Sequence, residues 1–212
     1  MDFLVTMTTH VPQGTTEDTV AEVRQREAAH SHKLAERGSL RRLWRPPLQP
    51  GEWRTLGLFI ADDADEGESV LASMPLRIWR SDEVILLQPH PNDPNLAGIG
   101  LGRESLIAMT IAVPDGTASS AVDDKLSREA QRARELSGQG HLRRLWALPA
   151  EEPVRRTLGL WNARDPNELD NILKSLPLYP WMTVTTTELS PHASDPATLK
   201  CGVAELRPPS RG

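Results

Sequence analysis

The order of apolar and polar residues divides the first 94 positions of the chain into six successive segments. Residues 3–11 are rich in β-branched and apolar side chains and stop at Pro12, which predicts a strand followed by a turn. Hydroxyl and acidic residues at 15–18 and Gly38 mark the ends of a predicted helix of about 20 residues. The pattern that follows predicts strands at 40–45 and 54–61, a helix at 62–74 and a last strand at 79–87.

This succession of strand, helix, strand, strand, helix and strand is typical of a ferredoxin-like domain. Both helices of such a domain cover one face of an antiparallel sheet. The opposite face is left uncovered and has to be buried against another element.

The same pattern returns in the second half of the chain. Residues 4–94 and 106–196 can be superimposed without a gap at a constant offset of 102 positions. The segment Leu-Arg-Arg-Leu-Trp, for example, occupies residues 40–44 and again residues 142–146. A repeat of this length indicates a duplicated domain, because solenoid repeats have periods of about 20–50 residues.

We therefore predict an α+β protein in which two ferredoxin-like (βαββαβ) domains pack sheet to sheet as a fused pseudo-dimer of the dimeric α/β-barrel type. The predicted domains span residues 1–94 and 106–196. Residues 95–105 are rich in glycine and are predicted to be a linker, and residues 197–212 show no periodicity and are predicted to be a loose tail. Assembly of this pseudo-dimer into a larger homo-oligomer is left open.

Composition narrows the possible partners. A net charge of −5 argues against nucleic acid or an anionic membrane as the main partner. No stretch approaches the roughly 18 apolar residues that cross a bilayer, and no basic segment precedes an apolar run at the N-terminus. Neither the histidines nor the single Cys201 have metal-ligand spacing, so no metal is predicted. We expect a soluble, cytoplasmic protein.

The first predicted helix carries a carboxylate within its apolar stripe. Val20, Val23 and Leu34 share a helix face with Glu27, and the same stripe in the second copy carries Glu129. Burial raises the pKa of a carboxyl group toward neutral pH, as a general base requires. The alternative is a structural role, in which each glutamate forms an ion pair with an arginine of the next strand.

The next strand contains the pairs Arg41-Arg42 and Arg143-Arg144. Neighbouring residues of a strand point to opposite faces, so one arginine of each pair should face the inner surface of the sheet. An inward guanidinium group can hold a substrate carboxylate through two hydrogen bonds. A solvated arginine, or one that pairs with a glutamate, is the structural alternative.

Aromatic and histidine residues are also retained in both copies. Trp44 and Trp146 are explained by core packing or by a pocket wall for a flat ligand. His90 and His192 each follow a proline beyond the last strand. A histidine in such a tail can act as an acid or an orienting group at a neighbouring site, or can simply cover the surface.

These residues, taken in order, resemble the muconolactone isomerase family over nearly the whole length of each copy. No single short motif carries the resemblance, which lies in the shared order and spacing of the motifs. In the first copy they are Met7-Thr8 followed by Pro12, Glu27, Gly38, Arg41, Leu43-Trp44-Arg45, Pro75-Leu76 and His90-Pro91.

The resemblance implies an enzyme that needs no cofactor and moves the ring double bond of a small-molecule butenolide by a 1,3-proton shift. It implies that Glu27 and Glu129 carry the proton, and that Arg41 and Arg143 bind a carboxylate or an oxyanion. It implies that the segments after the last predicted strands bring His90 and His192 to the site. Arg45, Trp44 and Trp146 complete the substrate-binding set.

The chain also departs from the family. Arg42 and Arg144 stand where the family has histidine, and Arg45 is replaced by Ala147 in the second copy. Because these positions surround the predicted pocket, they leave the substrate open. A cyclase or a dehydrohalogenase on the same scaffold and a small-molecule binding protein without catalysis are the alternatives.

Overall fold

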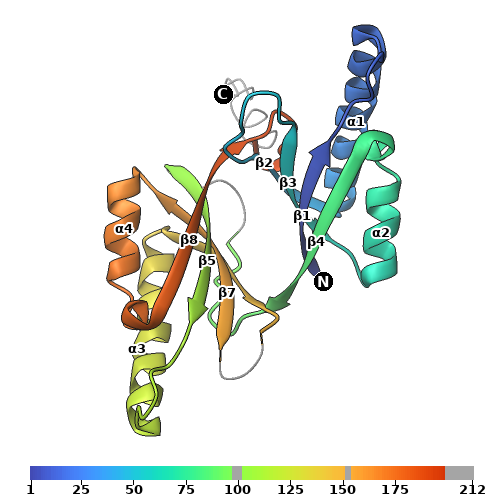
Figure 1. Ribbon diagram of the computed structural model, residues 1–212. Coiled ribbons are helices and arrows are strands. Elements are labelled where there is room, and N and C mark those ends of the chain that lie inside the picture. The colour runs from blue at the N-terminus through green and yellow to red at the C-terminus, as the bar shows by residue number, and fades with distance from the viewer. Residues whose placement is uncertain (97–101, 151–153, 199–212) are drawn as a thin grey trace, which may run out of the picture. The chain divides into compact units, whose positions relative to one another are not determined.

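Each half of the chain forms the predicted succession of elements (Figure 1). The computed structural model describes residues 1–96, 102–150 and 154–198. The first half contains β1 (Asp2–Thr9), α1 (Glu17–Arg37), β2 (Leu40–Arg45), β3 (Arg54–Ile60), α2 (Ala64–Ala72), the 3-10 helix η1 (Pro75–Trp79) and β4 (Arg80–Pro89). The second contains β5 (Arg103–Ile111), α3 (Ser119–Gly138), β6 (Leu142–Leu148), β7 (Arg155–Ala163), α4 (Pro166–Lys174), the 3-10 helix η2 (Tyr179–Trp181) and β8 (Met182–Pro191).

The two sheets have the same register around a glycine. Val5 of β1 and Leu43 of β2 both pair with Gly57 of β3, and Ile107 and Leu145 pair in the same way with Gly159 of β7. A Cβ atom on Gly57 would lie 2.4 Å from the ring of Phe59, and one on Gly159 would lie 2.2 Å from the indole of Trp161. The repeated Arg-Thr-Leu-Gly-Leu segment therefore keeps its glycine to make room for an aromatic ring.

The ends of the last strands are exchanged between the copies. One unit comprises Met1–Leu86 together with the chain from Ser190 onward, and the other comprises Leu87–Leu189. In unit 1 the end of β8 pairs with β2, with Pro191 opposite Trp44. In unit 2 the end of β4 pairs with β6, with Pro89 opposite Trp146. Each unit is thus completed by chain that follows the last strand of the other copy.

Hydrogen bonding links the strands in the antiparallel order β1-β3-β2-β8-β5-β7-β6-β4, which closes back to β1. This order and the two βαββαβ successions confirm the predicted α+β class. β5 begins at Arg103, inside the range predicted as the linker. Residues 97–101 of that range and 199–212 of the predicted tail lie outside the described residues.

Apolar residues of each helix pair pack on the strands of their own unit. The core of unit 1 gathers Val5 from β1, Leu34 from α1 and Leu71 from α2, and the core of unit 2 gathers Ile107 and Leu136 in corresponding places. Within the described residues, no helix combines the length and the apolar composition needed to cross a membrane. The helices pack on the sheets of their own units, and residues of their inner faces line the pockets.

Candidate active site

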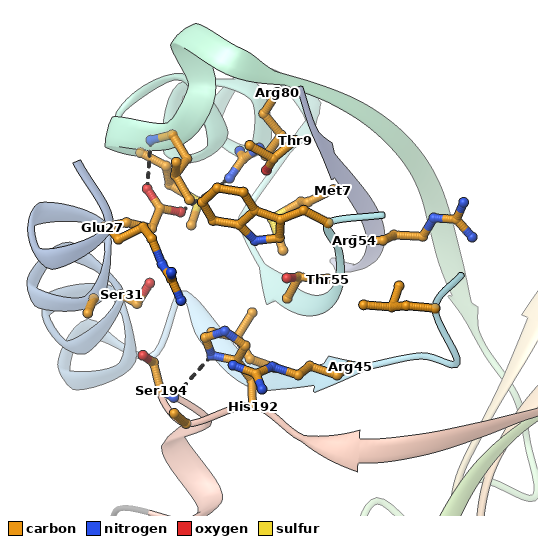
Figure 2. A pocket seen from close by; sticks show the side chains of 18 residues that line it. Met7, Thr9, Glu27, Ser31, Arg45, Arg54, Thr55, Arg80, His192 and Ser194 are labelled. Carbon is orange, nitrogen blue, oxygen red and sulfur yellow. Dashed lines mark hydrogen bonds and ion pairs between the residues drawn. The ribbon is translucent and has the colours of Figure 1, made fainter. Parts of the chain in front are cut away.

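Unit 1 contains a pocket of about 520 Å³, bounded by α1, the first three strands and the chain that follows β8. This volume lies within the range of about 300–1,000 Å³ that is usual for small-molecule sites. Figure 2 shows Glu27 and Ser31 of α1 on one side and His192 and Arg45 on another. The lining residues are Met7, Thr9, Arg24, Glu27, Ala28, Ser31, Leu43, Arg45, Leu48, Trp53, Arg54, Thr55, Met74, Leu76, Arg80, His192, Ala193 and Ser194.

Glu27 is held at the pocket by two contacts. Its Oε2 accepts a hydrogen bond of 2.8 Å from the backbone N–H of Leu76, and its Oε1 lies 3.3 Å from Nη1 of Arg80. The side chain is 13% exposed. Burial raises the pKa of Glu27, and the Leu76 hydrogen bond and the charge of Arg80 oppose that rise without cancelling it.

Arg80 is itself part of a buried network. Its Nε lies 2.6 Å from Oδ1 of Asp82, and both side chains are only 2% exposed. Arg77 also pairs with Asp82. The guanidinium group that reaches Glu27 is therefore held in place by Asp82 and is not an independent surface charge.

Unit 2 contains the corresponding pocket, of about 490 Å³. Oε2 of Glu129 accepts a hydrogen bond of 2.9 Å from the backbone N–H of Leu178. Burial raises the pKa of Glu129, and the Leu178 hydrogen bond and the charge of Lys125 oppose the rise. Lys125 donates its own hydrogen bond to the carbonyl oxygen of Pro177 and lies 4.9 Å from the ring centre of Trp181.

The walls of the second pocket are more apolar than those of the first. Met182 and Val184 occupy the positions that correspond to Arg80 and Asp82, so the buried ion network is absent there. The lining residues are Gln88, His90, Asn92, Met109, Ile111, Leu126, Glu129, Ala133, Leu142, Leu145, Ala147, Leu148, Pro149, Ala150, Val154, Arg155, Arg156, Thr157, Trp161, Leu176, Leu178 and Met182.

Each pocket receives its histidine from the chain that follows the last strand of the other copy. His192 lines the pocket of unit 1, and His90 lines the pocket of unit 2. Nδ1 of His192 accepts a 3.1 Å hydrogen bond from the backbone N–H of Ser194, and Nδ1 of His90 accepts one of 3.1 Å from Asn92. A nitrogen that accepts carries no proton, so both rings are held with the proton on Nε2.

The charge state of the histidines agrees with this tautomer. Burial lowers the pKa of His192, and the nearby charges of Arg45 and Arg24 lower it further, while Asp195 opposes them. Burial also lowers the pKa of His90. At neutral pH both imidazoles are therefore neutral, and each presents an Nε2–H donor.

An aspartate holds each of the two histidine-bearing segments that follow β4 and β8, which we call the histidine tails. Asp195 is fully buried and accepts hydrogen bonds from Nε and Nη2 of Arg42 and from the backbone N–H of Leu43. Asp93 likewise accepts hydrogen bonds from Nε of Arg144 and from the backbone N–H of Leu145. We call these contacts the tail clamps. They assign the second arginine of each Arg-Arg pair to the docking of the tail.

Several predicted site residues lie elsewhere. Arg41 is exposed and Arg143 is partly exposed, and neither is among the described residues that line these two pockets. Trp44 and Trp146 are buried behind the sites, where the clamp arginines lie over their rings at 4.8 and 4.6 Å. Arg45 lines the pocket of unit 1.

The displacement of Arg41 has a local cause. The register between β2 and β3 shifts between Leu40 and Arg42, so the strict alternation assumed for this strand fails there. Arg42 is thereby turned inward, onto Asp195. The same shift occurs between Leu142 and Arg144 in unit 2.

Other pocket residues were not singled out from the sequence. Arg54 and Thr55 line the first pocket, and Arg156 and Thr157 line the second. They belong to the repeated Arg-Thr-Leu-Gly-Leu segment, and their retention in both copies was a usable signal. Arg80 gave no such signal, because the second copy lacks it.

Comparison with known protein families finds the same family in both copies of the repeat. The profile of the family described as muconolactone delta-isomerase matches residues 1–93 and again residues 104–195. The chain belongs to the muconolactone delta-isomerase family. The profile matches each copy separately, so each copy is a member in its own right.

Individual relatives in this family are distant. The muconolactone delta-isomerase of Acinetobacter baylyi is 28% identical over 92 residues, which is 43% of this chain and 93% of the relative. The enzyme of Rhodococcus opacus is 25% identical over 89 residues, or 42% of this chain and 92% of the relative. One such relative therefore corresponds to about half of this chain.

Solved structures resemble the chain as a whole. A heme-binding protein from Thermus thermophilus is 12% identical with a TM-score of 0.54, and the match covers 95% of both chains. A chlorite dismutase from Candidatus Nitrospira defluvii is 12% identical with a TM-score of 0.53, covering 90% of this chain and 91% of the other. At this identity the likeness shows the fold alone.

Proposed function

We propose that this protein is a cofactor-independent isomerase that moves a carbon–carbon double bond in an unsaturated lactone or a related carbonyl acid. The observation that carries the proposal is the constellation that the two pockets share. Each contains a mostly buried glutamate with a raised pKa and a neutral histidine with its proton on Nε2. An arginine and a threonine of β3 or β7 complete each set.

The glutamate is the base in this mechanism. Oε2 is anchored by the backbone N–H of Leu76 in unit 1 and of Leu178 in unit 2. The carboxylate takes a proton from the γ carbon of the lactone, and the electron pair of that C–H bond moves into the ring to form a dienolate. The same carboxyl group then returns a proton at the α carbon, so the product has the formula of the substrate.

The histidine stabilises the negative charge that develops on the carbonyl oxygen. A neutral imidazole with Nε2–H donates a hydrogen bond to that oxygen without first giving up a proton. In both units Nδ1 is already an acceptor, which supports this assignment over that of a general base. Positioned proton transfer contributes about 10²–10⁴-fold to the rate, and one oxyanion donor contributes about 10²–10³-fold.

Solvent deuterium exchange tests the proposal. Candidate butenolides are incubated in D₂O with the protein, and carbon-bound deuterium is followed by NMR. The double variant Glu27→Gln with Glu129→Gln keeps the shape of both side chains and removes both bases, so we expect a folded protein with exchange reduced by about 10²–10⁴-fold. The two single variants report the share of each unit.

Three results would contradict the proposal. Full exchange by the double variant would remove the glutamates from the mechanism. Tight binding of the butenolides by the native protein without exchange would favour a binding protein. Turnover of a different substrate by ring closure or loss of halide, with no double-bond shift, would favour a cyclase or a dehydrohalogenase.

A further inference from the structure

The two pockets differ most in the side chains around the histidine. In unit 1, Arg24 of α1 and Arg45 of β2 line the pocket, and both lie close enough to His192 for their charges to affect it. Their counterparts in unit 2 are Leu126 and Ala147, which line the second pocket. Two cations are thus replaced by two apolar groups at equivalent places.

The two arginines of unit 1 are available to a ligand. Arg24 lies over the ring of Trp53, with its Cζ atom 5.2 Å from the ring centre, which holds the guanidinium group at the pocket. Within the described residues, neither Arg24 nor Arg45 forms an ion pair. Both are exposed, so solvent and ligands can reach them. An arginine pair of this kind suits a carboxylate, which each planar fork can bind through two hydrogen bonds.

Unit 2 offers no equivalent near its histidine. Arg155 and Arg156 line its pocket from β7, but they correspond to Trp53 and Arg54 and not to Arg24 and Arg45. Among the described residues, the charge that acts on His90 is that of Asp93, which opposes the lowering of the His90 pKa by burial. Met182 adds a further apolar group in place of Arg80.

We infer that the two pockets take chemically different substrates. Unit 1 takes an anionic lactone whose carboxylate is bound by Arg24 and Arg45, and unit 2 takes an uncharged lactone whose apolar substituent packs against Leu126 and Ala147. The lactone part of this inference rests on the proposed function, and the difference in ligand charge rests on the pocket walls alone.

The difference has a physical cause at each site. A carboxylate placed between Leu126 and Ala147 would lose water, and neither of these two side chains can replace the lost hydrogen bonds, which is unfavourable. An ester or alkyl group placed between Arg24 and Arg45 would separate two guanidinium groups from water without replacing their hydrogen bonds. Each pocket therefore selects by excluding the ligand of the other.

A matched pair of probes tests the inference by binding alone. The probes are a butenolide with a carboxymethyl substituent and its methyl ester, titrated calorimetrically into the Glu27→Gln, Glu129→Gln chain, which does not turn them over. We expect one tight site per chain for the acid and one for the ester. Raising the salt concentration should weaken the binding of the acid only.

The chain supplies its own control variants. Arg24→Leu with Arg45→Ala copies unit 2 into unit 1 and should weaken binding of the acid by about tenfold or more. Leu126→Arg with Ala147→Arg copies unit 1 into unit 2 and should create a second site for the acid. All four positions lie at pocket walls, and circular dichroism checks that each variant is folded.

The outcomes separate this inference from the proposed function. Equal binding of the acid at two sites, no effect of Arg24→Leu with Arg45→Ala, or no binding of either probe would overturn the inference. If binding follows the expected pattern while the native protein exchanges no deuterium, the inference stands and the proposed isomerase activity fails. If the native protein isomerises both probes equally at both sites, the proposed isomerase activity stands and the inference of different substrates fails.

Discussion

The two pockets hold the same carboxylate in two different ways. The backbone contact is the same in both units, because Leu76 and Leu178 donate to the glutamates at 2.8 and 2.9 Å. The side-chain contacts differ, since Glu27 has Arg80 as an ion-pair partner, whereas the cation that acts on Glu129 among the described residues is Lys125. The duplicated copies therefore retained the element that places the base and diverged in the charges that tune it.

The tail clamps give the largest expected difference between the units. Asp195 is fully buried, whereas the side chain of Asp93 is 15% exposed. Replacing Asp195 by Asn removes the charge opposite a buried Arg42, which should lower the free energy of unfolding by about 3–5 kcal/mol. Asp93→Asn should lower it by less, because water can reach Arg144. Urea unfolding of the two variants measures both values, and equal losses would show that the clamps are equivalent.

The histidines allow the exchange of tails to be tested by activity. His192→Gln should reduce turnover in unit 1 by about 10²-fold, although residue 192 belongs to the second copy of the repeat. The measurement uses the Glu129→Gln chain, in which unit 1 is the working site. His90→Gln in that same chain is the control and should leave the rate nearly unchanged. A loss with His90→Gln and none with His192→Gln would contradict the assignment of the tails.

Exchanging the residues around the base should move the pH dependence of each unit. Arg80→Met with Asp82→Val copies unit 2 and removes a network in which Arg80 lowers the pKa of Glu27 more than Asp82 raises it. The pKa of Glu27 should then rise. Because the base acts in its deprotonated form, the acid limb of the kcat/KM profile should move to higher pH.

The reverse exchange sharpens the comparison. Met182→Arg with Val184→Asp should move the acid limb of unit 2 to lower pH, since an added guanidinium group favours the carboxylate of Glu129. Profiles that do not move in either chain would show that the network has a structural role only. Removing both members of the buried pair together avoids leaving Asp82 without Arg80.

The smallest expected difference lies at the start of the long helices. Thr16 caps α1 through a hydrogen bond from the backbone N–H of Thr19, while Ala118 at the same position of α3 provides no side-chain cap. Ala118→Thr should therefore stabilise the protein by about 0.5–1 kcal/mol, and Thr16→Ala should destabilise it by a similar amount. Thermal unfolding of both variants tests this, and a neutral Ala118→Thr would indicate that the start of α3 is held by other contacts.

The parts of the site that follow from regular structure were predictable. Helix periodicity placed Glu27 and Glu129 on the inner faces of α1 and α3, because an unbroken helix repeats its face every 3.6 residues. The element bounds agree within a few residues, and Gly38 ends α1 in a left-handed conformation with φ of 81°. These features depend on neighbours close in sequence.

The parts that depend on irregular or distant contacts were not predictable. The register shift in β2 turns Arg42 inward onto Asp195 and leaves Arg41 exposed. Arg80 meets Glu27 across 53 positions, and a search for residues shared by both copies passes over it. The exchange of tails also leaves no local trace, since His90 and His192 stand at equivalent positions whichever pocket they enter.

The exchanged tails have a consequence for the history of the gene. In a homodimer, every substitution appears at both sites, so the sites cannot diverge. In this chain, codon 24 and codon 126 mutate separately, and Arg24 and Leu126 record the result. Yet losing either copy would also take the histidine from the pocket that remains, because His192 and His90 serve opposite units. Duplication here gave the two sites separate inheritance, while each pocket still takes its histidine from the other copy.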